Sequence, residues 1–381
     1  MRPFQIRLSL ATTLVALAAG TAFAEIELTK EFSISGYIAG SATYQKFDEM
    51  GSDNNTDIDA YKLQGVARFD KVSFTGSVFA YGTGDGHGYG SSPIVLDAYG
   101  TYDFGTGTTV TAGKFLSSLG YEAFDVVNLN QISYANGDFA NLMFAEILNG
   151  LGQLQEIIHL RPFFGASIPG YHTGLKVENQ LKDVTLGVAV VDSLFGHSYY
   201  KGDGDIDNGL GFEAYAKYTG VQHLTLFAGL GYENKRTNLG KLLGGPDGLQ
   251  LKSRYLVADF WGEYVWNKTT LGAEFCWTGM TIKNLTNRSI KPDNYFWSVL
   301  VKQGFGEKWA TTFRISQTAL DLDGFMFGVA GTIDTWKYTF APSYAVTKNL
   351  DIVAEYSYTT FDISFDHVHG DFLGIQTRFK F

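Results

Sequence analysis

The sequence predicts an all-β chain that closes into a transmembrane antiparallel β-barrel of about 16 strands. Three observations support this fold class. Apolar and polar side chains alternate along most clear segments, short and long connections alternate between those segments, and no long apolar run follows the N-terminal region. Strands of about ten residues with this alternation are typical of barrels that cross a membrane.

The first residues have the pattern of a secretory signal peptide. Basic residues precede an apolar run over 8–19, and Ala22-Phe23-Ala24 has the small-x-small form of a cleavage site. A membrane-spanning helix needs about 20 apolar residues, so this run is too short to be one. We therefore interpret 1–24 as a cleaved signal peptide and 25–381 as a single exported barrel domain.

The composition agrees with export and excludes some classes of partner. The chain has 45 Gly, 30 Phe and 22 Tyr, but only one Cys. An exported chain with a single cysteine is not held together by disulfides. Its formal charge of −10 also argues against a nucleic-acid partner, because such proteins contact phosphates through Lys and Arg.

The strands are read from side chains that alternate with a period of two. In 184–190 every second residue is aliphatic, and in 350–358 apolar residues alternate with Asp351, Glu355 and Ser357. Each such segment is a strand with one apolar and one polar face. Further clear segments lie at 224–232, 271–277 and 309–316.

The connections separate into two classes of length. Short ones lie at 69–72, 103–108, 181–184, 219–223, 266–269, 304–308 and 346–349. Long ones lie at about 45–57, 83–92, 116–170, 193–208, 233–250, 281–292, 317–334 and 361–369. We interpret the short ones as periplasmic turns and the long ones as external loops, with both chain ends on the side of the turns.

A closed barrel explains this pattern better than a secreted β-sandwich. A sandwich buries its apolar faces against each other and needs no regular asymmetry of loop length. In lipid, by contrast, every backbone polar group must be paired, and a closed sheet achieves this. Aromatic residues at strand ends are expected to form interfacial girdles: Trp261, Tyr264, Trp266, Trp336 and Tyr338.

The strand count predicts a channel, because barrels of about 16 strands leave an aqueous lumen. The polar face of each strand then lines water. Basic residues expected on this inner wall are Lys62, Arg68, Lys176, Arg314, Lys337 and Arg378.

The longest connection, 116–170, is expected to fold into or over the lumen. Its apolar residues between 142 and 154 have helical spacing, which predicts one or two short helices. Its acidic residues are expected to face the basic wall and form a constriction: Glu122, Asp125, Asp138 and Glu146. Alternatively, these acids hydrogen-bond within the loop and hold its shape.

Three segments resemble a known family. "GKFLSSLGYEAFD" from Gly113 to Asp125 is similar to a motif of the outer-membrane-protein-L-like family of β-barrel porins. "EFSISGYIAGSATY" and "HTGLKVE" are similar to that family as well. General bacterial porins carry at this place a third external loop that enters the barrel and narrows the pore, and the resemblance implies the same for 116–170.

The resemblance implies a porin of the bacterial outer membrane, through which small hydrophilic solutes and ions diffuse passively. It also implies a homotrimer surrounded by lipid and lipopolysaccharide. A substrate-specific channel for sugars or aromatics is the alternative, with Tyr37, Tyr99, Tyr215 and Tyr255 as a stacking track. A structural or adhesive barrel without an open pore is a third possibility. An enzyme is not expected, because the chain has no GxSxG motif.

Other motifs give weaker signals. Asp203, Asp205 and Asp207 begin like an EF-hand loop, but Ala214 stands where a bidentate Glu is expected, so a solvated acidic loop is favoured over a calcium site. His367 and His369 lie with acidic residues near the last loop, where we favour plain exposure. The glycine-rich stretch 82–90 lacks the strand-to-helix context of a phosphate site, and no cofactor is expected.

The last segment, "DFLGIQTRFKF" from Asp371 to Phe381, is expected to pair with the first strand near 32–44 and close the sheet. Its final aromatic residue, Phe381, resembles the signal by which the outer-membrane assembly machinery recognises its substrates.

Overall fold

The computed structural model describes residues 25–48, 51–81, 93–122, 125–135, 168–194, 206–207, 210–238, 250–283, 289–291, 293–321, 332–363 and 366–381. The expected signal peptide over 1–24 lies outside these residues.

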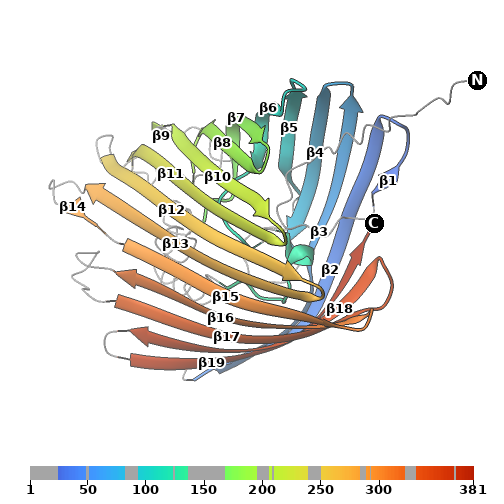
Figure 1. Ribbon diagram of the computed structural model, residues 1–381. Helices are drawn as coiled ribbons and strands as arrows, with labels where there is room; N and C mark the ends of the chain where they lie inside the picture. The colour runs from blue at the N-terminus through green and yellow to red at the C-terminus, as the bar shows by residue number, and fades with distance from the viewer. Residues whose placement is uncertain are drawn as a thin grey trace, which may run out of the picture.

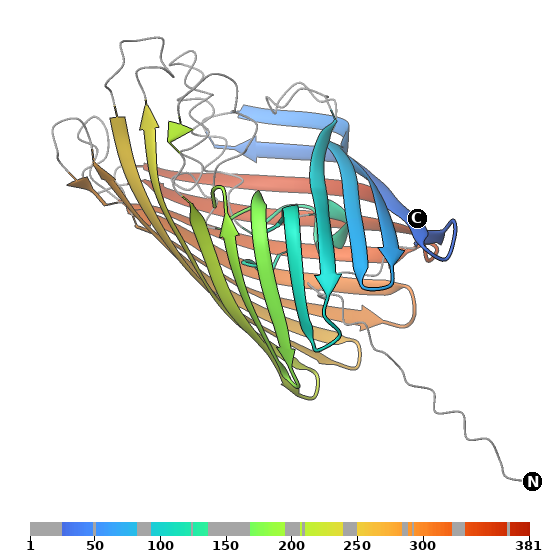
Figure 2. The ribbon, with the colours of Figure 1, turned by 90° about the horizontal axis from the view of Figure 1, so that it is seen from above.

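In the described part of the chain, nineteen strands form one sheet, and the sixteen longer strands close it into an antiparallel barrel (Figure 1; Figure 2). The longer strands are β2 (Phe32–Phe47), β3 (Gly51–Phe69), β4 (Val72–Tyr81), β5 (Ile94–Asp103), β6 (Thr108–Leu116), β7 (Tyr171–Leu181), β8 (Val184–Val191), β10 (Gly211–Val221), β11 (Leu224–Asn238), β12 (Gln250–Trp266), β13 (Thr269–Lys283), β15 (Asp293–Phe305), β16 (Trp309–Asp321), β17 (Thr332–Ala345), β18 (Leu350–Ile363) and β19 (Asp366–Lys380). Two-residue strands flank the ring: β1 (Ile26–Glu27), β9 (Ile206–Asp207) and β14 (Ser289–Ile290). The predicted fold class and strand count are confirmed.

The seam of the barrel joins β19 to β2, as the sequence predicted. The register runs from Gly370 opposite Phe47 to Lys380 opposite Tyr37. Phe381 continues the ladder, because its N–H donates to the Gly36 carbonyl at 3.0 Å and its carbonyl accepts from the Gly36 N–H at 2.8 Å. A side chain at Gly36 would collide with the Phe381 ring and with a neighbouring carbonyl, so the aromatic ring packs directly over this glycine.

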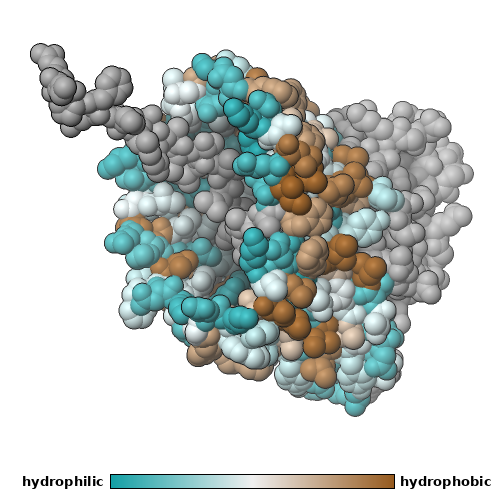
Figure 3. All heavy atoms as spheres, turned by 90° about the vertical axis from the view of Figure 1, so that its right-hand side faces the viewer, coloured by the Kyte–Doolittle hydropathy of each residue, from teal (hydrophilic) through white to brown (hydrophobic). Residues whose placement is uncertain are grey.

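The two faces of the sheet differ as alternation requires. On β19, Leu373, Ile375 and Phe379 are exposed on the outer face, whereas Gln376 and Arg378 are buried on the inner face. Seen from the end that carries the short turns, the described residues form hydrophilic and hydrophobic patches side by side (Figure 3). No helix among the described residues is long and apolar enough to cross a membrane.

All seven short turns lie where the sequence placed them, but two of the expected long loops are wrong. β2 continues to Phe47 and β3 resumes at Gly51, while β18 and β19 are separated only by 364–365. In the first hairpin the backbone ladder extends into a segment whose side chains are mostly polar, and in the second into one where polar and apolar side chains are mixed. Alternation of apolar residues marks only the part of a strand that faces lipid, so it cannot detect this extension.

The expected aromatic girdle is correct for the outward residues of β12 but wrong for Trp261. Tyr264 and Trp266 are exposed on the outer face. Trp261 shares the inner face with Asp259, and its ring stacks on Phe227 with centroids 5.0 Å apart and an interplanar angle of 7°. An aromatic residue near a strand end can point to either face of the sheet. Its parity along the strand determines which face it occupies.

Candidate functional site: a loop segment bound inside the barrel

The segment 117–135, described except for 123–124, follows β6 and lies inside the ring of strands (Figure 2). In β6, which leads into this segment, one glycine permits close approach to the neighbouring strand β5. Gly113 has φ of +128°, and a Cβ there would lie 2.2 Å from the Ala98 carbonyl oxygen. Only glycine adopts this conformation readily, so the first residue of the "GKFLSSLGYEAFD" motif has a backbone role.

The first part of the segment, 117–121, is held by carboxylates of neighbouring strands. We call these four residues the acidic wall: Glu213 on β10, Asp259 and Glu263 on β12, and Glu274 on β13. The Gly120 N–H donates to Asp259 at 2.7 Å, and the Tyr121 N–H donates to Glu274 at 2.8 Å. The Tyr121 hydroxyl donates to Glu263 at 2.8 Å, and the Ser117 hydroxyl donates to Glu213 at 2.5 Å.

The acidic wall has few countercharges. Among the described residues, no Lys or Arg lies within ion-pair distance of Asp259, Glu263 or Glu274. One oxygen each of Asp259 and Glu274 is buried without a hydrogen-bond partner. Burial and the neighbouring Glu263 carboxylate raise the pKa of the Tyr121 hydroxyl, so this group stays protonated and can donate. These carboxylates therefore act as acceptors for the loop rather than as members of ion pairs.

Apolar side chains seal the same contact. Leu119 packs against Phe227, Val257 and Phe296 of the wall in one buried cluster. Tyr121 lies against Trp261 with ring centroids 5.5 Å apart, and Trp261 stacks in turn on Phe227. The first part of the segment is thus fixed by both polar and apolar contacts.

The middle of the segment is bound on the side of β2, β3 and β5. Lys62 lies 3.2 Å from Asp125 and 3.0 Å from Asp97, and the Tyr37 hydroxyl donates to Asp125 at 3.1 Å. All of these side chains are largely buried. A single helical turn follows at Val126–Asn128, and its two valines join a core cluster with wall residues.

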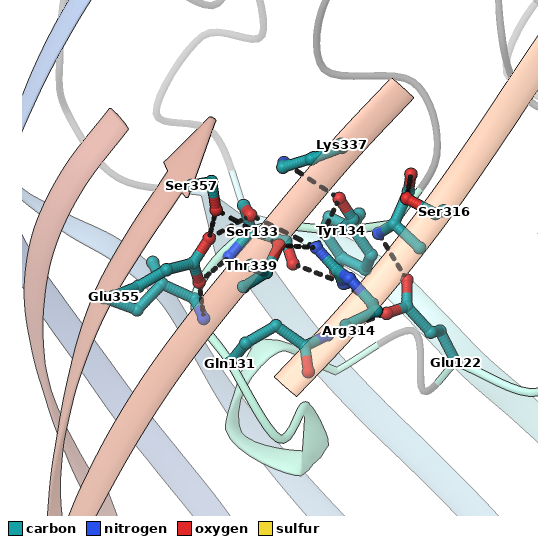
Figure 4. Close-up of polar contacts among 12 residues, drawn as sticks. Glu122, Gln131, Ser133, Tyr134, Arg314, Ser316, Lys337, Thr339, Glu355 and Ser357 are labelled. Atoms are coloured by element: carbon teal, nitrogen blue, oxygen red, sulfur yellow. Dashed lines mark hydrogen bonds and ion pairs between the residues drawn. The ribbon is translucent and has the colours of Figure 1, made fainter. Parts of the chain in front are cut away.

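The last part of the segment, 129–135, is held by cations. We call these four residues the basic wall: Lys302 on β15, Arg314 on β16, Lys337 on β17 and Arg378 on β19. Arg314 donates to the carbonyls of Ser133 at 3.0 Å and Tyr134 at 3.2 Å (Figure 4). Further bonds run from Lys337 to Tyr134 O at 3.0 Å, from Arg378 to Leu129 O at 2.7 Å and to Gln131 O at 2.5 Å, and from Lys302 to the Asn130 side chain at 3.0 Å.

Two carboxylates complete the basic side. Glu122 accepts from Arg314 at 2.6 Å, from the Gln131 side chain at 2.7 Å and from the Ala135 N–H at 2.7 Å. Glu355 on β18 accepts from the N–H and the hydroxyl of Ser133, the former at 2.9 Å. Glu122 thus combines the two roles that the sequence left open, since it pairs with the wall and also bonds within the loop.

The structure brings together some of the expected site residues and separates others. Glu122 meets Arg314, and Asp125 meets Lys62. Lys176 pairs with Glu178 at 3.2 Å, away from the described loop acids. Arg68 lies at the exposed end of β3, where it pairs with Glu25 at 2.8 Å, and it does not contact the described part of the loop.

Several sequence interpretations fall outside the described residues. These are Asp138 and Glu146, the helices expected between 142 and 154, and Asp203 and Asp205; Asp207 lies in β9, but its side chain is not described. His367 is exposed and lies beside Asp362. Within the described ranges no group of three or more His, Cys, Asp or Glu side chains could hold a metal ion.

Alternation along the sequence directs Asp259, Glu274 and Glu355 to the inner wall, but the sequence analysis assigned them no role in the site. The available signal was that inward acids recur on neighbouring strands. Their partners in 117–135 are mostly backbone N–H and carbonyl groups, which every residue carries, so no pattern of side chains could identify them.

His172, Ser117 and Glu213 lie close together, but their geometry differs from that of a hydrolase triad. His172 and the Ser117 hydroxyl lie on the same carboxylate, since His172 Nε2 is 3.8 Å from Glu213 and Ser117 bonds to Glu213 directly. In a Ser-His-Asp triad the histidine instead bridges the serine and the acid. Both His172 nitrogens are also buried without a hydrogen bond.

No family model and no curated protein sequence matches the chain. Solved structures do match its fold. OmpT of Vibrio cholerae, an outer-membrane protein, superposes with a TM-score of 0.57 at 12% identity over 94% of this chain and all of its own. Salmonella typhi OmpF gives 0.57 at 13% identity over 93% of this chain and all of its own. An anion-selective porin from Comamonas acidovorans gives 0.56 at 10% identity, covering 92% and 99%. The chain therefore has the porin fold of an outer-membrane barrel.

Proposed function

We propose that this protein is an outer-membrane porin, which forms a water-filled channel for passive diffusion of small hydrophilic solutes and ions. One observation carries the proposal: a closed barrel of sixteen long strands holds a loop segment bound to opposite sides of its inner wall. A ring of this size leaves a lumen that its own wall side chains do not fill. The segment 117–135 narrows that lumen and so limits the size of solute that passes.

The narrowing is set by loop acids that meet basic wall residues. Among the described residues, the proposed constriction consists of two ion pairs, Glu122 with Arg314 and Asp125 with Lys62. Lys337 and Arg378 hold the loop beside these pairs. Each pair is in direct contact, so it fixes the loop against the wall and limits the width of the passage left beside it. Asp138 and Glu146 stay candidates for the same constriction.

The alternatives have less support. A stacking track of tyrosines needs accessible rings, but Tyr37 and Tyr255 are buried, with 1% and 4% of their surface exposed. A specific channel for sugars or aromatics would therefore have to use other rings. A barrel without an open pore would require 116–170 to fill the whole lumen.

Conductance in planar lipid bilayers tests the proposal. The purified full chain should give stable steps on the order of a nanosiemens, as expected for a water-filled lumen. Steps that one sugar blocks at low concentration would favour the specific channel, and a complete absence of steps would contradict a porin.

Neutral variants test the constriction. Glu122→Gln and Asp125→Asn remove loop charge without changing side-chain size, so the reversal potential in a salt gradient should shift. Glu307→Gln, in an exposed short turn, is the matched control and should leave the potential unchanged. If the two loop variants also leave it unchanged, these residues do not line the constriction.

Processing, assembly and the membrane environment of the protein are also proposals. We infer a cleaved signal peptide over 1–24, a homotrimer in lipid and lipopolysaccharide, and recognition of Phe381 by the outer-membrane assembly machinery. Deleting Phe381 removes two backbone bonds of the seam, so it should lower the yield of assembled barrels and leave the conductance of each unchanged.

A further inference from the structure

We infer that the half of the channel between the loop segment and the short turns selects small anions, although the chain as a whole is acidic. This inference rests on the proposed function and names the class of solute that the channel prefers. It comes from the placement of lysines on the inner wall below the loop. The overall composition, with 39 acidic and 29 basic residues, would suggest cations instead.

Four strands carry inward lysines close to their short-turn ends. Lys176 precedes the end of β7 at Leu181, Lys217 precedes the end of β10 at Val221, and Lys302 precedes the end of β15 at Phe305. Lys380 is the last residue of β19, two residues beyond buried Arg378. All four lysines are half-buried. Because β7 and β10 lie far from β15 and β19 in the ring, cations stand on separate sections of the wall.

The carboxylates in the same half are engaged. Glu178 pairs with Lys176 and also accepts from the Tyr215 hydroxyl. Asp351 pairs with Lys380 at 3.3 Å, and Glu263 accepts from the Tyr121 hydroxyl. These three acids stand beside the four lysines and Arg378, whereas Glu274 and Glu355, also close to the short-turn ends of β13 and β18, are bonded to the loop segment.

Two of these lysines, Lys217 and Lys302, have no carboxylate within ion-pair distance among the described residues, and Glu178, Asp351 and Glu263 act on them only from farther away. Lys302 bonds to the neutral Asn130 side chain, and Lys217 forms no hydrogen bond or ion pair with any residue that the structure describes. Across the strands Lys217 stands opposite Thr185 and Phe227, which are uncharged.

Two acids of the inner wall, Asp259 and Glu274, are hidden from this space. Asp259 is 0% exposed and Glu274 is 3% exposed, because the loop segment covers both. Charges behind the loop act on a permeating ion only at a distance, whereas the half-buried lysines can contact it. An excess of one sign of charge around a low-dielectric passage concentrates ions of the opposite sign. Chloride, carboxylates and phosphate are the solutes that this arrangement favours.

Reversal potentials of the full chain in planar bilayers, measured across a KCl gradient and then a potassium acetate gradient, test the inference. The wild-type channel should pass chloride more readily than potassium, by about twofold or more. Lys217→Gln should lower that ratio, and Lys217→Gln with Lys302→Gln should bring it to about one or below. Lys217→Gln disturbs no described contact, so its effect is not a loss of fold.

Lys182→Gln is the matched control, because Lys182 lies in a short turn with 90% of its side chain exposed. It should leave the ratio unchanged. A cation-selective wild-type channel, or a ratio that the Lys217 and Lys302 variants do not change, would overturn the inference while the porin stands. A protein that gives no channel contradicts the proposed function itself.

Discussion

The two ends of the loop segment are bound by opposite chemistry. Residues 117–121 offer N–H and hydroxyl groups to the carboxylates of the acidic wall, whereas 129–135 offer carbonyl groups to the cations of the basic wall. A peptide has a donor and an acceptor at every residue, so each wall selects the end of the peptide dipole that suits its sign. The loop is thereby fixed through its backbone, on both sides of the lumen.

The two contacts differ in how their charges are compensated. On the basic side, Arg314 has Glu122 as a partner, and Glu355 lies among the same loop residues. On the acidic side, Asp259 and Glu274 have no described cation within ion-pair distance, and each has an unpartnered oxygen. Breaking a buried pair is strongly destabilising, whereas a buried charge without a partner is a liability that a neutral group can relieve. Charge should therefore be essential at Arg314 and Glu355 and dispensable at Asp259 and Glu274.

Arg314→Met should produce the largest effect. The substitution removes a fully buried guanidinium, leaves Glu122 without its cation and frees two loop carbonyls. Breaking such a pair costs about 3–5 kcal/mol. Urea unfolding of the refolded barrel should show this loss, and single channels should become larger or noisier as 129–135 detaches.

Arg68→Met is the control for that variant, because the Arg68–Glu25 pair is about half exposed. An exposed pair contributes about 0–1 kcal/mol. Equal losses for the two variants would contradict the distinction between the basic wall and the rim.

Glu355→Gln should have an intermediate effect. The amide presents one acceptor and one donor where two N–H groups and two hydroxyls now converge on a carboxylate. Leaving buried donors unpaired costs about 1–3 kcal/mol. Amide exchange at Ile132 and Ser133 should accelerate, and unchanged exchange would show that Glu355 does not hold the loop. Glu307→Gln, in an exposed turn, should leave exchange at these amides unaffected.

Asp259→Asn with Glu274→Gln should have the smallest effect and can have the opposite sign. Each amide keeps a carbonyl for the loop N–H, and its NH₂ replaces an oxygen that has no partner. Removing two uncompensated buried charges should leave stability unchanged or raise it, by up to about 1 kcal/mol. Urea midpoints measure this directly. A loss as large as that of Glu355→Gln would mean that both walls need their charge.

Strand parity explains how much of the barrel the sequence could predict. Alternation placed Arg314, Lys337 and Arg378 on the inner face, because a one-residue change in parity would have exposed them to lipid. Trp261 was predicted in the outer girdle because it lies near the end of a strand, but its parity along the strand places it on the inner face. Polar extensions of strands, such as 51–57, were not predicted. Their backbones pair as in any strand, but their side chains show no alternation of apolar and polar residues.

The site was less predictable than the fold. The length and position of 116–170 predicted a loop inside the barrel, and charge predicted that Glu122 and Asp125 would face basic residues. Which wall residue binds which loop residue depends on the shape of the loop. Some of the bound groups are backbone groups, such as the carbonyl of Leu129, and these have no distinctive side-chain chemistry. Local sequence does not specify which of sixteen strands a backbone carbonyl will meet.

The seam between β2 and β19 also bears on the order in which the parts of the barrel assemble. The ring cannot close until β19, the last strand to be synthesised, meets β2, the first of the long strands. Contacts between such distant parts of a chain form late, because their loop closure is entropically unfavourable. The segment 117–135 contacts strands on both sides of this seam, so it has the opportunity to dock while the sheet is still open. A loop that docks before closure does not have to thread through a finished ring.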